Sequence, residues 1–291
     1  MRNWDAPGAA LLSVMALGIC GCPPDGGRGL APFPPPDRAT ALASINENLA
    51  RINQPVRLSG NVTFRFRDAE DKSRSVSEDA NLEFIGPRSL LLEVRALTGK
   101  VAELGSNNEQ YWVYVDLPDY RKLWWGTWAA LGPQTERRLP VPPNELLDAL
   151  LLRPLPLMAE GGLAPLLRTA DGDFRLLYIR LGADRQPIGW REVRLDDRPP
   201  WQPREIIDRT PEGTVLMHAL LSDYKRIGDD GPYTPRRYIV RWPLDEAELR
   251  LDISRARFRP DAAPIESPVA GFRGEVESID APPPPGGARQ P

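Results

Sequence analysis

The chain has few of the residues that most often build catalytic and metal centres. It contains one histidine, His218, and two cysteines, Cys20 and Cys22, among 291 residues. One histidine excludes an HExxH zinc site, and the sequence also lacks the GxSxG, Walker A and GxGxxG motifs. Because both cysteines stand near the start, the rest of the chain has no pair for a disulfide or a CxxC site. The composition predicts a protein that is not an enzyme and that uses no cofactor and no metal.

Concentrated charge and long apolar runs are missing as well. The net charge is -3, with no basic block that would indicate nucleic-acid binding. The N-terminal apolar run, Ala9–Cys20, is shorter than the roughly 20 residues that a membrane-spanning helix needs. Proline, in contrast, is frequent, with 33 residues in the chain, and it is densest at 23–36 and 282–291. This distribution predicts stiff, extended ends around a folded middle.

The remaining polar candidates have structural explanations. His218 stands in the apolar segment Leu216–Leu220, where a lone histidine is typical of a strand rather than of a site. The acid pairs Asp196-Asp197 and Asp229-Asp230 lie beside proline or glycine, as solvated turn residues do.

The first 22 residues resemble the signal of a bacterial lipoprotein. The apolar run ends in Ile19-Cys20-Gly21-Cys22, where a small residue precedes Cys22 and an aliphatic residue stands three positions before it. The resemblance implies a signal peptide at 1–21, a lipid anchor on Cys22 and a Pro/Gly-rich tether at 22–36. More than one acyl chain on that cysteine would make the membrane attachment stable. An ordinary secretory signal that contains cysteine is the alternative.

A period of two dominates the segment after the tether. From Val56 to Arg67, apolar residues or glycine alternate with polar residues over twelve positions, which predicts a strand with one buried face. The same alternation returns at 80–84 and 90–94, although Leu91 interrupts the polar side. We expect the apolar phase of these three strands to form one surface, contributed by Val62, Phe64, Leu82, Phe84, Leu90 and Leu92.

Helical spacing occurs at two places. Asp37 is a candidate N-cap for an amphipathic helix that ends near Asn53, before Pro55. A second, short helix begins at Asn144 and ends before Pro154, with a wide apolar face made of Leu146, Leu147, Leu150 and Leu151. A helix this apolar inside a sheet protein is a candidate lid; plain core packing is the alternative.

Short strands joined by polar turns fill both halves of the chain. We expect about 10 or 11 strands in a mainly β, curved antiparallel sheet, with the N-terminal helix and the short helical insert covering it. No proline- or glycine-rich linker divides the middle, so residues 37–279 are predicted to form one domain, with a disordered tail at 280–291.

Tryptophans gather in two further predicted strands, Tyr111–Val115 and Lys122–Trp128. Trp112, Trp124 and Trp125 are candidates for lining an acyl cavity, and contact with a membrane interface is a further possibility, because indole combines an apolar body with one donor. Ordinary cross-strand packing is the alternative.

The order of parts resembles the LolA/LolB-like superfamily of periplasmic carriers and outer-membrane receptors for lipoproteins. The resemblance covers most of residues 37–258, and its local motifs are Leu58-Ser59-Gly60, Leu97-Thr98-Gly99-Lys100, Pro143-Asn144-Glu145-Leu146-Leu147, Ile188-Gly189-Trp190 and Pro203-Arg204-Glu205-Ile206-Ile207. It implies a half-open β-barrel whose concave side holds acyl chains and is closed by helices.

Together these features predict a lipid-anchored protein of the cell envelope that faces the periplasm, with the outer membrane favoured over the inner. Its expected function is non-catalytic binding or transfer of a lipid or an acylated lipoprotein. The alternative is a lipoprotein scaffold that binds a protein partner in an envelope complex. An open apolar cavity would favour transfer, and a filled interior with an exposed strand edge would favour the scaffold.

Overall fold

The computed structural model describes residues 35–68, 70–132, 139, 141–170 and 173–280. The first half contains α1 (Arg38–Ala50), β1 (Val56–Arg67), β2 (Ser73–Gly86), β3 (Ser89–Ala96), β4 (Gly99–Ser106), β5 (Gln110–Leu117), β6 (Tyr120–Thr127) and α3 (Pro143–Ala149). The second half contains β7 (Leu166–Ala170), β8 (Asp173–Leu181), β9 (Pro187–Leu195), β10 (Pro203–Arg209), β11 (Val215–Ser222), β12 (Lys225–Arg226), β13 (Tyr233–Thr234), β14 (Arg237–Trp242), β15 (Ala247–Phe258) and β16 (Glu275–Ser278), with 3-10 turns η1 (Pro243–Asp245) and η2 (Pro268–Gly271).

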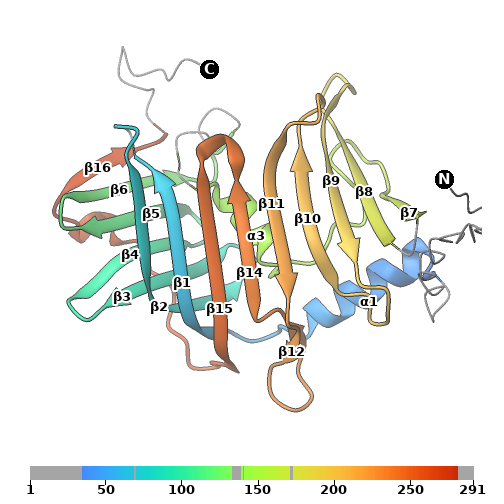
Figure 1. The fold of residues 1–291 in the computed structure, drawn as a ribbon, viewed down its shortest axis with the longest axis horizontal. Helices are drawn as coiled ribbons and strands as arrows, with labels where there is room; N and C mark the ends of the chain where they lie inside the picture. The colour runs from blue at the N-terminus through green and yellow to red at the C-terminus, as the bar shows by residue number, and fades with distance from the viewer. Residues whose placement is uncertain (1–34, 69, 133–138, 140, 171–172, 281–291) are drawn as a thin grey trace, which may run out of the picture.

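One sheet of fourteen strands organises the molecule, in the order β16-β6-β5-β4-β3-β2-β1-β15-β14-β11-β10-β9-β8-β7. Two antiparallel meanders, β1–β6 and β7–β11, are joined at the centre, where β15 pairs with β1. The sheet curves strongly, so that β3–β6 run across the direction of β1, β15 and β14 (Figure 1). β16 is the exception to the antiparallel order, because it pairs in parallel with β6.

The curvature includes a local irregularity at the centre of the sheet. The register between β1 and β15 shifts between Ser59 and Gly60. A Cβ at Gly60 would stand 2.0 Å from the carbonyl oxygen of Asp252, so glycine is required where the two backbones approach.

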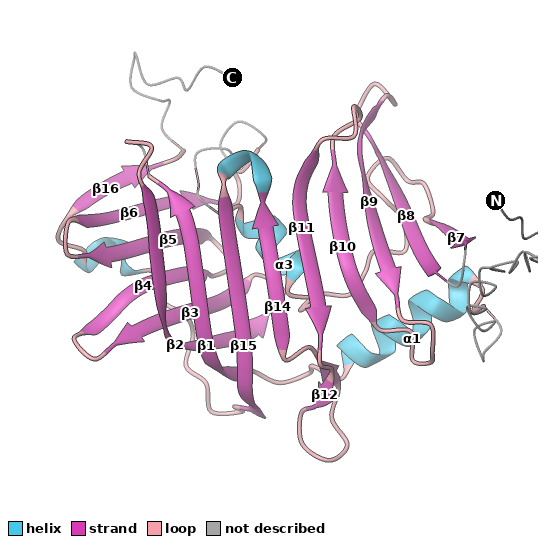
Figure 2. Cartoon of the chain, in the orientation of Figure 1, coloured by secondary structure: helices cyan, strands magenta, loops and turns pink. Residues whose placement is uncertain are grey.

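Helices α1 and α3 lie on the concave side of the sheet and share its core (Figure 2). Asp37 caps α1 by accepting a hydrogen bond from the backbone N–H of Thr40, as its position predicted. Asn46 and Asn48 then tie α1 to its surroundings, since each exchanges two hydrogen bonds with the backbone, at Leu155 and Tyr233 respectively. The helix is therefore positioned by specific polar contacts as well as by its buried apolar stripe.

The C-terminal segment after β15 covers the convex side of the first half. Its residues Ile265, Val269 and Phe272 pack in a second apolar cluster with side chains from β3, β5 and β6. Leu91, which interrupts the alternation of β3, belongs to this cluster, so its apolar character is explained by a cover on the second face. The segment ends as β16 along the edge of β6.

The predicted fold class is confirmed: the protein is mainly β, with a curved sheet that does not close into a barrel and a short helical insert. The sheet has more strands than the ten or eleven expected. β16 has four residues and β7 five, too short for an alternation to stand out.

Candidate functional site

The six residues predicted to form the apolar surface of the first three strands do lie together. Val62, Phe64, Leu82, Phe84, Leu90 and Leu92 all belong to the main core cluster, and none is more than 5% exposed. The register of β1 with β2, and of β2 with β3, places them on one side of the sheet. This is the concave side.

The three tryptophans are divided between the two faces. Trp124 lies on the concave side with Val113, its cross-strand partner. Trp112 and Trp125 are partners of each other in the same pair of strands, and both belong to the cluster under the C-terminal segment. The structure therefore places Trp112 and Trp125 in the cluster on the convex side, although Trp112 also borders the small space beneath α3.

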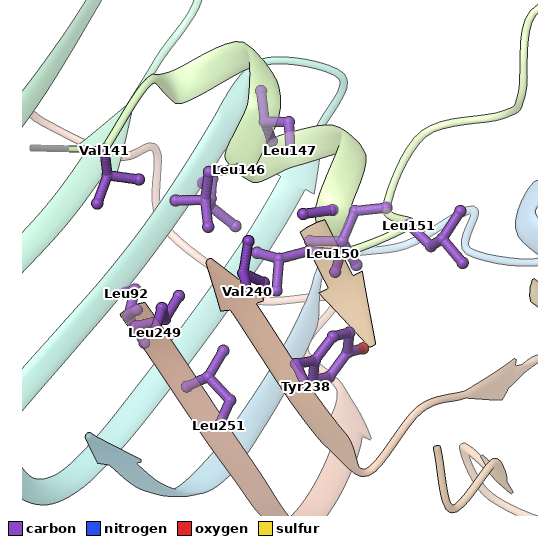
Figure 3. Packing of buried hydrophobic residues seen from close by; sticks show 14 of the residues in the cluster. Leu92, Val141, Leu146, Leu147, Leu150, Leu151, Tyr238, Val240, Leu249 and Leu251 are labelled. Atoms are coloured by element: carbon purple, nitrogen blue, oxygen red, sulfur yellow. The ribbon is translucent and has the colours of Figure 1, made fainter. Parts of the chain in front are cut away.

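The short helical insert lies over the concave surface. All four predicted lid residues, Leu146, Leu147, Leu150 and Leu151, are buried, and none is more than 5% exposed. Figure 3 shows Leu146 and Leu150 between α3 and the side chains of Val240 and Leu249 from β14 and β15. Leu146 also borders a small space with Leu90 of β3 and Leu104 of β4, so this helix covers apolar residues from both halves of the sheet.

Helix α3 has weak ends of its own. Its N-cap is Pro142, which supplies no side-chain hydrogen bond, and the helix has only seven residues. Leu151, just after the C-cap, has a φ of 51°, a left-handed conformation that costs a non-glycine residue about 1–2 kcal/mol. The position of this helix therefore depends on its packing rather than on its own stability.

The space beneath α3 is filled in this form. A cavity of about 10 Å³ lies between α3 and strands β3–β5, lined by residues including Leu90, Leu104, Tyr111, Val113, Val141 and Leu146. That volume matches about one water molecule, whereas pockets for small ligands are typically about 300–1,000 Å³. This space admits an acyl chain only if α3 moves.

A charged network ties α3 to the second half of the sheet. Arg191 of β9 donates from Nε and Nη2 to the two carboxylate oxygens of Asp208, both at 2.7 Å. Its Nη1 donates at 2.7 Å to Asp148 of α3, and Arg153 also donates to that carboxylate. Asp208 is 1% exposed and the Arg191 side chain 15%, so this network lies largely out of water.

Burial opposes ionisation of Asp148, but the charges and hydrogen bonds of Arg191 and Arg153 outweigh it, so the pKa of Asp148 is lowered. Burial also opposes the charge of Arg191, and the two carboxylates raise its pKa. The pair is consequently ionised across the physiological range.

Tyr178 of β8 is the cross-strand partner of Arg191. Its hydroxyl is buried and has no hydrogen-bond partner among the described residues. Burial raises the pKa of Tyr178, so the hydroxyl stays protonated and can donate.

The polar residues of this site were not identified from the sequence, although a signal was present. Arg191 stands on the apolar phase of its strand with Val193 and Leu195, and Asp208 shares a phase with Ile206. A charged residue of each sign on the buried phase of two strands indicates a buried pair.

Other sequence candidates are placed outside this site. His218 lies at the surface of the second half, with Nε2 2.7 Å from Oε1 of Glu205. Cys22 lies outside the described residues. Within the described ranges, no group of three histidine, cysteine or acidic residues is arranged to hold a metal, and no helix is long and apolar enough to cross a membrane.

Comparison with known proteins gives structural likeness only. No family model and no curated protein matches the sequence. Similar solved structures include one described as an outer membrane lipoprotein-sorting protein domain from Vibrio parahaemolyticus, with a TM-score of 0.45 at 13% identity, covering 76% of this chain and 93% of the other. A DUF1329 family protein from Desulfovibrio piger has a TM-score of 0.45 at 10% identity over 77% and 94% of the two chains.

A LolA superfamily protein from Nitrosomonas europaea has a TM-score of 0.41 at 15% identity and covers 75% of this chain and 93% of its own. Each of these TM-scores is below 0.5, and the fold and the site stand on this chain's own contacts.

Proposed function

We propose that this protein binds the acyl chain of a lipid or an acylated lipoprotein on its concave surface, without catalysis, after α3 moves aside. The observation that carries the proposal is that α3 and the two residues after it bury four leucines, Leu146, Leu147, Leu150 and Leu151, against the apolar side chains of the concave surface. If α3 left, a continuous apolar surface would be exposed to water. An acyl chain can replace those leucines with little change in buried apolar area.

Because an acyl chain can take the place of these leucines, a filled interior is compatible with acyl binding. Apolar burial contributes about 25 cal/mol per Å² whichever apolar group supplies the area. The closed form, with α3 in place, and the acyl-bound form therefore compete with each other and bury similar apolar areas. Their balance sets the apparent affinity, which falls as the closed state becomes more populated.

Truncating a lid leucine tests this competition. Leu146→Ala removes packing from the closed form alone, so it should lower the free energy of unfolding by about 2–5 kcal/mol and raise affinity for a fluorescent fatty acid about tenfold or more. Both are measured on the full chain carrying Cys22→Ser. The matched control is Leu123→Ala, because Leu123 is equally buried but lies in the convex cluster.

Leu123→Ala should lower stability to a similar extent and leave acyl affinity unchanged. If both variants change acyl affinity equally, or neither does, α3 does not compete with the ligand and the proposal is wrong.

The anchor and the location complete the proposal. The Ile19-Cys20-Gly21-Cys22 pattern supports a lipid anchor on Cys22, which would hold the domain at a membrane facing the periplasm, with the outer membrane favoured. The proline-rich residues 23–36 would act as a tether.

A second function is favoured by the edge of the sheet. In the described part of the chain β7 pairs only with β8, so its other edge is open, and Leu166 on it is 56% exposed. An open edge is a site where another chain can add a strand, as a scaffold for an envelope complex would require. Leu166→Lys should abolish a partner complex and leave acyl binding intact if this function holds, and should affect neither if it does not.

A further inference from the structure

The three donor nitrogens of the Arg191 guanidinium contact two different parts of the molecule. Its Nε and Nη2 bind the carboxylate of Asp208, which belongs to the neighbouring strand β10. This two-point contact fixes the plane of the guanidinium from within the sheet. The third contact, from Nη1, reaches Asp148 of α3, the element proposed to move.

Movement of α3 would separate these contacts. Asp148 would leave with the helix, and Arg153, which also binds Asp148, follows it closely in the chain. Arg191 would keep its contact with Asp208 and lose the one to Asp148. A buried cation that loses a partner is costly unless water or another anion takes the vacated position.

The surroundings of that position suit an anion that carries an acyl chain. The Tyr178 hydroxyl, on the strand beside Arg191, is a buried donor without a partner among the described residues. Leu176 and Val193 follow on the same face of these two strands and are fully buried. A charged donor and a neutral donor therefore stand at one end of an apolar surface.

We propose that Arg191 binds the anionic oxygen group of an acyl ligand where the Asp148 carboxylate lies when α3 is closed, and that the Tyr178 hydroxyl donates to an oxygen of that group that extends beyond this place. This inference rests on the proposed acyl-binding function and specifies its ligand class: an acyl chain ending in a carboxylate or a phosphate. Asp148 acts in the closed form as an internal substitute for that group. The charge-assisted contact adds a preference that apolar burial alone does not provide.

Matched ligands test the preference. Binding of oleate, oleyl alcohol and monooleoyl phosphatidate to the full chain carrying Cys22→Ser is measured by displacement of a fluorescent acyl probe, with inorganic phosphate as the anion without a chain. Both anionic lipids should bind at least about tenfold more tightly than the alcohol. Inorganic phosphate at millimolar concentration should not displace the probe. Comparison of oleate with the phosphatidate tells a carboxylate ligand from a phosphate one.

Two variants test whether the charged network around Arg191 causes the preference for anionic ligands. Arg191→Met alone leaves the buried carboxylate of Asp208 without its partner and leaves Asp148 with Arg153 only. The combined variant Arg191→Met, Asp148→Leu and Asp208→Leu is therefore used, because replacing a buried ion pair by apolar residues is tolerated. It should bind oleyl alcohol as the parent does and show no preference for oleate. Asp148→Asn should raise affinity for oleate and for the alcohol by the same factor, since it weakens only the closed form.

Each outcome has a distinct meaning. If the parent binds oleate and oleyl alcohol equally, or if the combined variant keeps the preference, the anionic site is wrong while acyl binding stands. If phosphate alone displaces the probe, the site is one for a free anion and the inference is overturned. If none of the ligands binds, both the inference and the proposed function fail.

Discussion

The indole of Trp112 lies against Gly105 on the neighbouring strand, and its Nε1 donates to Oε1 of Glu103 at 2.6 Å. A Cβ at position 105 would stand 2.3 Å from the indole ring. The most buried tryptophan of the convex cluster is therefore positioned by the absence of a side chain beside it. The indole of Trp112 packs in the cluster that the C-terminal segment covers.

This contact predicts that Gly105→Ala destabilises the fold by about 1–3 kcal/mol, because the added methyl group forces the ring to shift. Urea unfolding followed by tryptophan fluorescence measures the effect. Gly86→Ala is the control, since nothing lies within 4 Å of a Cβ there, and it should change stability little. Acyl binding should be the same for both variants, and a loss of binding in Gly105→Ala would place Trp112 in the site after all.

The lowered pKa of Asp148 predicts how closure by α3 depends on pH. A carboxyl group whose pKa is lower in the closed form than its ordinary value of 3.8 stabilises that form above this value, and the contribution is lost as pH falls through the lowered pKa. Hydrogen-exchange protection factors of α3, taken relative to β1, should stay constant from about pH 8 to 5 and fall below about pH 4.

Asp148→Asn should show reduced protection of α3 from about pH 8 to 5 and no such fall below about pH 4. A change in the relative protection of α3 between pH 8 and 5 would show that another group controls the helix.

The end of the described chain is predicted to be part of the folded domain. Ile279 is fully buried, and its N–H donates to the carbonyl of Trp125 at 2.9 Å. Ile279→Ala should lower the free energy of unfolding by about 2–5 kcal/mol in urea. Val276→Ala on the same segment should cost about 0.5 kcal/mol or less, because Val276 is 44% exposed. Equal effects of the two substitutions would mean that the β16 segment is not packed as described.

The N-terminal pattern predicts that Cys22 carries the membrane anchor. Cells that express the full chain or its Cys22→Ser variant are fractionated, and the membranes are washed with high salt. The parent should stay in the membrane pellet and the variant should be released. Cys20→Ser is the control and should behave as the parent, because Ile19 stands where a small residue is needed before Cys20. A variant at Cys22 that still resists the wash would exclude this cysteine as the anchor.

Sequence alternation predicted the concave surface because β1, β2 and β3 each have one polar and one buried phase. It did not separate Trp112 and Trp125 from Trp124, because Tyr111, Trp112, Val113 and Tyr114 are all buried, so both faces of β5 are apolar and alternation cannot assign a side. The cover that buries the second face comes from residues 259–280, far away in the sequence. Pairing of that kind has no local signature in the chain.

The charged network was missed for a related reason. Arg191 is one of many arginines, and only its phase distinguishes it from Arg194, which lies on the outer face and pairs with Asp173. That Asp148 is its partner depends on where α3 lies over the sheet. The sequence predicted that α3 exists and that its leucines face the interior, but not which strands it covers.

Photolabelling tests the central claim most directly, because it locates the acyl chain itself. The full chain carrying Cys22→Ser is irradiated with a fatty acid that bears a diazirine at mid-chain, and the labelled peptides are identified by mass spectrometry with excess oleate as competitor. Binding on the concave surface predicts competed labels on β3 and β14, around Leu92 and Val240, and weaker labelling there when Arg191, Asp148 and Asp208 are replaced together. Labels confined to the exposed residues Leu157, Met158 and Leu166 would contradict the account.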